Sequence, residues 1–112
     1  MLNIVTIVGR LVNTPTITHT DTKKVSEITI GVSRSYKNAD GIYDADFIDC
    51  VLWSNMAVTT AEYCRVGDVI GVKGRLQSDN GTLKVVADKI SFISNKKDTE
   101  IHQETNNFEG EI

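Results

Sequence analysis

Along most of the chain, apolar and polar side chains alternate with a period of two, which is typical of β-strands. The pattern is clearest in residues 25–36, where Ile28, Ile30 and Val32 share one face. Five segments follow it and are predicted to be strands: residues 3–12, 25–36, 44–53, 69–78 and 82–94. In the fourth, alternation predicts that Ile70, Val72 and Leu76 point inward and that Lys73, Arg75 and Gln77 point outward.

The alternation stops at Trp53, and a helical pattern replaces it. Ala57, Ala61 and Cys64 follow at i, i+4 and i+7, which predicts a helix over residues 56–65. Ser54 or Asn55 is suited to the N-cap position. Arg65 in the last turn and Gly67 just beyond it are typical of a helix C-terminus.

The predicted turns and the glycines within strands indicate how these elements are arranged. The segments "NADG" (38–41) and "SDNG" (78–81) are predicted to be tight turns between strands. Gly9 in "VGRL" and Gly74 in "KGRL" mark bends of the kind that a small closed barrel needs. Three strands, a short helix and two further strands predict an all-β, five-stranded oligonucleotide/oligosaccharide-binding (OB) barrel, with the helix between strands three and four. A five-stranded sandwich with an added helix is the competing architecture.

The third strand carries an unusual face. Alternation places Phe47, Asp49, Val51 and Trp53 on one side, whereas the opposite side is entirely apolar and is predicted to be core. Exposed rings on a barrel are platforms for single-stranded bases, each worth about 1–3 kcal/mol. Aromatic residues also favour strands in general, and Trp53 would equally serve to cover the start of the helix. Asp49 would repel phosphate, so we expect a partner for it such as Arg75 or Arg34.

Charge divides the chain into two parts. The net charge of −3 comes entirely from residues 96–112, because residues 1–95 contain ten acidic and ten basic residues. The last segment, "KKDTEIHQETNNFEGEI", is polar and without sustained periodicity. We therefore predict one domain over residues 1–95 and a disordered acidic tail over residues 96–112.

Other chemistry finds little support in the sequence. Asp44 and Asp46 alternate to the opposite face from Asp49, so the three are interpreted as solvated residues and not as a metal site. His19, expected in a loop, and His102, in the tail, have no ligands at suitable spacing, and no cofactor is expected. No nucleophile–base pair or phosphate-binding loop appears, so the chain is not expected to be an enzyme. Cys50 and Cys64 are expected to be free buried thiols, and no apolar run is long enough to span a membrane.

Several segments together resemble the bacterial and phage single-stranded DNA-binding protein family. They are "MLNIVTIVGRL", "ITIGVSRSYKNADGIYDADFIDCVLW", "AEYCRVGDVIGVKGRLQS" and "ISFIS", in register over residues 1–95. The resemblance implies a homotetramer of OB barrels that binds single-stranded DNA without sequence preference and protects it during replication, recombination and repair. It also implies a cytoplasmic location at the nucleoid or at replication sites, or in the host cytoplasm for a phage protein.

The resemblance assigns residues to this function. Bases would stack on Tyr36, Phe47 and Trp53. The phosphate contacts are expected from the basic residues themselves and not from the resemblance. The leading candidates are Lys73 and Arg75, which point outward on one strand, and the others are Arg10, Arg34, Lys37 and Lys84. The tail departs from the family's Asp-Ile-Pro-Phe-type end, yet Phe108, Glu109, Glu111 and Ile112 are candidates for docking replication or recombination proteins; a plain solubilising tail is the alternative. The hairpin at residues 78–81 is short and lacks the family's aromatic residue. A second hypothesis is an adaptor barrel that binds protein or structured RNA.

Overall fold

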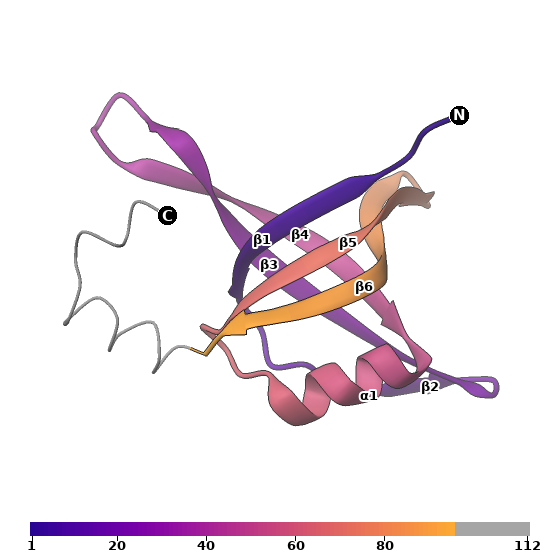
Figure 1. Ribbon diagram of the computed structural model, residues 1–112. Coiled ribbons are helices and arrows are strands. Elements are labelled where there is room, and N and C mark those ends of the chain that lie inside the picture. The colour runs from indigo at the N-terminus through magenta and orange to yellow at the C-terminus, as the bar shows by residue number, and fades with distance from the viewer. Residues whose placement is uncertain (96–112) are drawn as a thin grey trace.

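The computed structural model describes residues 1–95, so the predicted tail and its docking residues lie outside the described part of the chain. The elements, in chain order, are β1 (Val5–Leu11), β2 (Thr18–Thr20), β3 (Lys23–Lys37), β4 (Tyr43–Trp53), α1 (Ser54–Tyr63), β5 (Val69–Asp79) and β6 (Thr82–Ser94) (Figure 1). All five predicted strands are present. The three-residue strand β2 was not predicted, and it places His19 on an exposed strand instead of in a loop.

The strands form a closed barrel. Their order in the sheet is β1-β5-β6-β4-β3-β2, and an additional pairing of β1 with β3 closes the five long strands on themselves. β4 and β6 pair in parallel, whereas the other pairs are antiparallel. The predicted OB barrel is therefore confirmed. The helix lies between the fourth and fifth strands, not the third and fourth, because the short β2 adds one to the count.

Two glycines permit the barrel to close, as predicted. A Cβ on Gly9 would lie 2.3 Å from the carbonyl oxygen of Gly31, at the point where β1 leaves β5 and begins to pair with β3. A Cβ on Gly74 would lie 2.0 Å from the carbonyl oxygen of Val86, next to a shift in the β5–β6 register. Both separations are impossible for real atoms, so only glycine allows the backbones to approach this closely.

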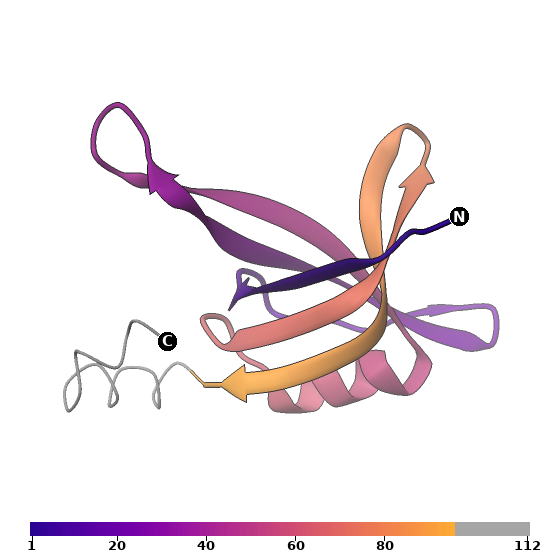
Figure 2. The ribbon, with the colours of Figure 1, turned by 45° about the horizontal axis from the view of Figure 1, so that its top comes forward.

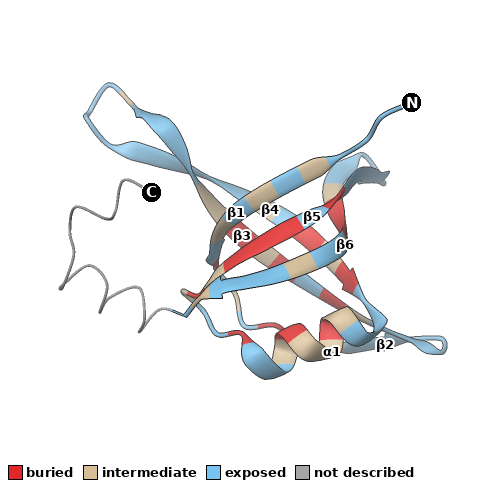
Figure 3. Cartoon of the chain, in the orientation of Figure 1, coloured by how far each residue is buried: buried red, intermediate tan, exposed pale blue. Residues whose placement is uncertain are grey.

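The barrel interior is the core, and the two long hairpins extend from it into solvent (Figures 2 and 3). Most of the fully buried side chains are aliphatic or thiol, among them Leu11, Ile28, Ile30, Cys50, Leu52, Ile70, Val72 and Val85, and the hydroxyls of Ser26 and Thr60 are buried with them. Leu76 was predicted to point inward and is instead 42% exposed. Beyond Gly74, β5 no longer pairs with β1, so the Leu76 side of the strand loses that covering neighbour although its partner on β6, Val85, remains buried.

The helix begins two residues before the predicted start. Trp53 occupies the N-cap position without a side-chain capping hydrogen bond, so neither Ser54 nor Asn55 caps the helix. Ala57 and Cys64 are buried as the pattern required. Arg65 lies beyond the last helical residue, where its Nη1 donates to the carbonyl oxygen of Cys64 at 3.0 Å.

Both predicted hairpin turns are present. Asn80 and Gly81 have φ of 52° and 84°, the left-handed conformations that a two-residue Asn-Gly turn requires. In the β3–β4 hairpin, Asn38 Oδ1 accepts hydrogen bonds from the backbone N–H groups of Asp40 and Ile42, at 2.9 and 3.0 Å. The resulting turn holds together the hairpin that projects furthest from the barrel (Figure 1).

Candidate nucleic-acid interface

The outer face of β3 and β4 exposes aromatic rings, as the alternation predicted. Phe47 and Trp53 are 67% and 40% exposed, whereas Cys50 and Leu52 on the opposite side of β4 are fully buried. β3 supplies the neighbouring row, because Gly31 pairs with Phe47 and Val25 with Trp53. The two rings are therefore presented to solvent by paired strands of a closed barrel.

Phe47 owes its orientation to a glycine on the neighbouring strand. The ring carbons Cε1 and Cδ1 lie 3.5 and 3.7 Å from the position that a Cβ on Gly31 would occupy. With no side chain there, the ring covers the backbone of β3, and most of its remaining surface faces solvent. An aromatic ring supported from below and open above is the arrangement that a stacked base requires.

Trp53 lies at the junction between a strand and the helix. It is the last residue of β4 and the N-cap residue of α1, with extended backbone angles of φ −112° and ψ 149°. The prediction that it covers the start of the helix and the prediction that it offers a stacking surface are thus compatible. The residue as a whole is 40% exposed.

Tyr36 and Tyr43 lie farther out, on the projecting β3–β4 hairpin, and are 63% and 55% exposed. The register shifts between Ser33 and Lys37, so simple alternation does not place Tyr36 on the face of Phe47, and its stacking role stays a prediction. Tyr43 continues the Phe47 side of β4 by alternation, and the Lys37 ammonium lies 5.6 Å from its ring centroid. Tyr43 was missed by the sequence reasoning, although its spacing of four residues from Phe47 is a usable signal.

The six basic residues that are candidates for phosphate contacts differ in their present interaction partners. Arg34 Nη2 lies 2.8 Å from Asp46, with Asp44 nearby, and this pairing raises the pKa of Arg34 and lowers that of Asp46. The other partners are Asp88 for Arg75 (3.1 Å), Glu27 for Lys84 and the Gly67 carbonyl for Arg10 (2.7 Å). Lys73 is exposed, and within residues 1–95 its ammonium has no ion pair; its cross-strand neighbour is Lys89.

The expected partner of Asp49 was wrong. Both arginines proposed for it pair with other acids, and Asp49 Oδ1 instead accepts a hydrogen bond from the Thr29 hydroxyl at 2.9 Å. The charge of Asp49 acts on the ammonium of Lys84. The hydrogen bond from Lys84 to Glu27 raises the pKa of that ammonium, and the charges of Glu27, Asp79 and Asp49 raise it further.

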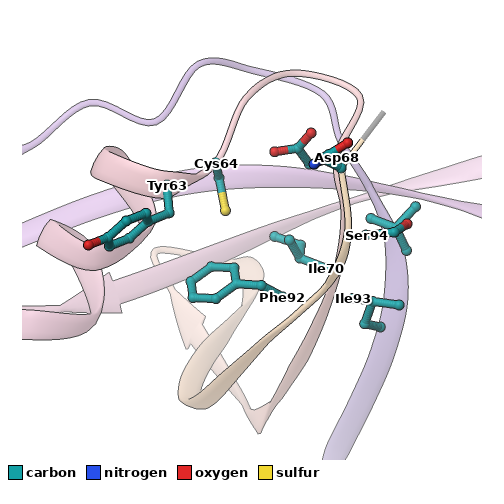
Figure 4. Close-up of a pocket in the computed structure, with 9 residues that line it drawn as sticks. Tyr63, Cys64, Asp68, Ile70, Phe92, Ile93 and Ser94 are labelled. Atoms are coloured by element: carbon teal, nitrogen blue, oxygen red, sulfur yellow. The ribbon is translucent and has the colours of Figure 1, made fainter. Parts of the chain in front are cut away.

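A cavity of about 380 Å³ lies elsewhere, between the C-terminal end of α1, the first residues of β5 and the last residues of β6. Tyr63 and Phe92 line it together with the thiol of Cys64 (Figure 4). Neither Phe47 nor Trp53 contributes to it, so it is separate from the aromatic face. Cys50 and Cys64 are free and buried, as predicted, and burial raises the pKa of their thiols to about 12 and about 11.

Two other features bear on the expected chemistry. Within residues 1–95, no three His, Cys, Asp or Glu side chains are grouped so as to hold a metal ion. The helix in this part of the chain falls short of the length and apolarity needed to cross a membrane.

Comparison with known proteins identifies the family. The model of the single-strand binding protein family matches residues 2–108. Single-stranded DNA-binding protein B of Bacillus subtilis (strain 168) is 38% identical over 106 residues, covering 86% of this chain and 94% of that protein. Single-stranded DNA-binding protein 1 of Lactococcus lactis subsp. lactis (strain IL1403) is 36% identical over 107 residues, covering 87% and 71%. The resemblance found in the sequence is confirmed, as is the prediction that the chain is not an enzyme: the protein belongs to the single-strand binding protein family.

Proposed function

We propose that this protein binds single-stranded DNA on the outer face of β3 and β4, with bases stacked on Phe47 and Trp53. The observation that carries the proposal is the pair of rings, 67% and 40% exposed, on one side of a single strand. Aromatic rings that serve only to stabilise the core would be buried, whereas both of these are exposed to solvent. Stacking contributes about 1–3 kcal/mol per base and works with every base, so binding is largely independent of sequence. Tyr36 and Tyr43 extend the same function along the hairpin.

Phosphate contacts supply the second part of the affinity. Among the residues that the structure describes, no carboxylate pairs with the ammonium groups of Lys73 and Lys37, whereas Arg34, Arg75 and Lys84 must first leave their ion pairs. Exposed pairs contribute only about 0–1 kcal/mol, so a phosphate readily replaces the carboxylate. We expect a shallow salt dependence, with a slope of about −0.7 per neutralised phosphate.

Assembly into a homotetramer is part of the proposal. On the outer surface of the barrel, the side chains of Val8 on β1 and Ile93 on β6 both approach the bare backbone of Gly71 on β5, and the two residues are 52% and 53% exposed. Contiguous apolar surface of this kind is typical of contacts between subunits. Light scattering should give four times the 12.4 kDa chain mass at micromolar concentration, and a monomer would contradict this assembly.

The proposed biological role is based on membership of the family. We infer that the protein protects single strands in the cytoplasm, at the nucleoid or at replication sites, during replication, recombination and repair. The acidic end of the chain, with Phe108, Glu109, Glu111 and Ile112, is our candidate for recruiting proteins of those processes. Recruitment is tested by comparing the full chain with a chain that lacks residues 96–112 in pull-downs from host lysate. If both capture the same proteins, the acidic segment does not recruit partners.

The experiment for the central proposal compares a single strand with its own duplex. A fluorescently labelled oligonucleotide is titrated with full-length protein, alone or annealed to its complement, and anisotropy is followed at two salt concentrations. We expect saturable binding to the single strand, weakened by salt, and little binding to the duplex, whose bases are already stacked. Equal affinity for both, or binding to neither as expected of a protein adaptor, would refute the proposal.

A further inference from the structure

Two lysines lie directly opposite each other on the outer wall that β1, β5 and β6 form side by side (Figure 1). Lys73 of β5 pairs with Lys89 of β6, and both residues are exposed. Directly opposed side chains have their Cβ atoms about 5 Å apart, and like charges at that separation destabilise a strand pair. Within residues 1–95, no carboxylate forms an ion pair with either ammonium. The repulsion is therefore left for an anion from elsewhere to offset.

The lysine pair adjoins the apolar surface that we propose for contacts between subunits. Gly71, at the centre of that surface, precedes Lys73 by two residues, and the β5–β6 register is unbroken between them. Same-side neighbours on a strand are about 7 Å apart. The lysines therefore lie one such step from the place where Val8 and Ile93 cover Gly71.

The strands of this wall are positively charged, in contrast to the domain as a whole. Residues 1–95 are neutral, whereas the stretches 5–10, 69–75 and 86–94 together contain four basic residues and one acid. That acid, Asp88, already forms an ion pair with Arg75. The neighbouring stretches of β1, β5 and β6 therefore do not neutralise the two lysines.

Assembly through this wall concentrates the charge further. A two-fold symmetric contact brings the same patch of both subunits together, so Lys73 and Lys89 of one copy approach the same two residues of the other. Four ammonium groups then border a surface from which water is excluded, and like charges repel more strongly there than in bulk water. A phosphate group binds lysine ammonium groups through its charged oxygens, so one group placed between the copies would hold both.

We propose that Lys73 and Lys89 form an anion-binding site at the subunit contact, which takes a phosphate group and is completed by the second copy. The inference rests on the proposed homotetramer and goes beyond it, because it makes assembly depend on a bound anion. A ligand that binds only the assembled form stabilises that form by mass action. Free phosphate and the backbone of a single strand supply the same chemical group.

The experiment follows assembly of the full-length protein by sedimentation velocity over a dilution series at low ionic strength. The buffer contains either chloride or inorganic phosphate at equal ionic strength, so that general screening is the same in both. We expect phosphate to lower the concentration at which half of the protein is assembled by at least about fivefold, the lower end of typical coupling between two binding events.

Three variants locate the effect. In Lys89→Glu, the new carboxylate forms a cross-strand ion pair with Lys73, so the subunits should assemble in chloride and phosphate should have no further effect. Lys89→Gln removes only the charge and should also lose the response to phosphate. Lys24→Glu makes the same charge change as the first variant, but on β3, where the cross-strand neighbour is His19, and should keep the wild-type response.

A short single strand added in place of phosphate separates the two sources of the anion. If the DNA backbone reaches the site, the single strand should promote assembly more in wild-type protein than in Lys89→Glu. An equal effect in both proteins would assign the site to free phosphate.

The outcomes distinguish this inference from the proposed assembly. Equal assembly of wild-type protein in chloride and in phosphate would overturn the inference and leave the homotetramer standing. A phosphate effect that persisted in Lys89→Glu would also overturn it, because the anion would then act at another place. If wild-type protein stayed monomeric in both buffers, the proposed assembly itself would fall, and the inference with it.

Discussion

Substitution of Phe47 should separate an effect on binding from an effect on folding most clearly. About a third of this residue is covered, which for a phenylalanine is some 50–80 Å² and at most about 1–2 kcal/mol of folding stability. Its exposed surface is what a base would use, at about 1–3 kcal/mol. In Phe47→Leu, the leucine still fills the space over Gly31, so the free energy of unfolding should change by less than about 1 kcal/mol. The stacking surface is lost, and affinity for a single strand should fall about 5- to 150-fold.

The assay pairs urea unfolding with anisotropy titration of a labelled oligonucleotide. Tyr63→Leu is the matched control, because Tyr63 is 71% exposed but lines the separate cavity near the end of α1. It should leave the affinity unchanged. Wild-type affinity in Phe47→Leu, or an equal loss in both variants, would refute the assignment of stacking to this face.

Three further predictions test the electrostatics, the barrel closure and the thiols. The double substitution Asp44→Asn with Asp46→Asn releases Arg34 from both of its carboxylates, so the slope of log affinity against log salt should steepen by about 0.7, and an unchanged slope would exclude a phosphate contact by Arg34. Gly74→Ala places a Cβ 2.0 Å from a carbonyl oxygen of β6 and should cost more than about 2 kcal/mol in urea unfolding; a smaller loss would mean that the strands separate easily. Burial raises the thiol pKa of Cys50 and Cys64 above the ordinary 9.0, to about 12 and about 11, so a thiol reagent at neutral pH should react only after unfolding. The buried thiols stabilise the fold fully below pH 9.0, where they are protonated in the folded and the unfolded protein alike, and this stability is lost as the pH rises through about 11 to 12. The free energy of unfolding, measured in urea at increasing alkaline pH, should therefore fall over this range.

Features that depend on local chemistry could be predicted from the sequence. Alternation is imposed by the geometry of a strand, so it correctly placed Phe47 and Trp53 opposite the buried Cys50 and Leu52. Glycines within strands are similarly informative, because a missing side chain has few uses other than a bend or close contact. Gly9 and Gly74 both proved to lie where backbones approach too closely for a Cβ.

Features that depend on distant residues could not be predicted. Arg34, Arg75 and Lys84 were all candidate phosphate contacts in the sequence, and only the fold brings each of them to a carboxylate. The three residues of strand β2 are polar and exposed, so the strand lacks the apolar alternation from which it could have been predicted. Alternation also misplaced Leu76, because the pattern cannot tell where the barrel ends and an exposed hairpin begins.

The most direct test of the central claim uses the protein's own fluorophore. Trp53 is the only tryptophan in the chain, so its emission reports on one position of the proposed stacking face. Titration with an unlabelled single strand should quench this emission progressively until the protein is saturated, because a base stacks on the indole, and the duplex of the same sequence should leave it nearly unchanged. Tight binding of the single strand, seen by anisotropy, with no change in Trp53 emission would contradict the account.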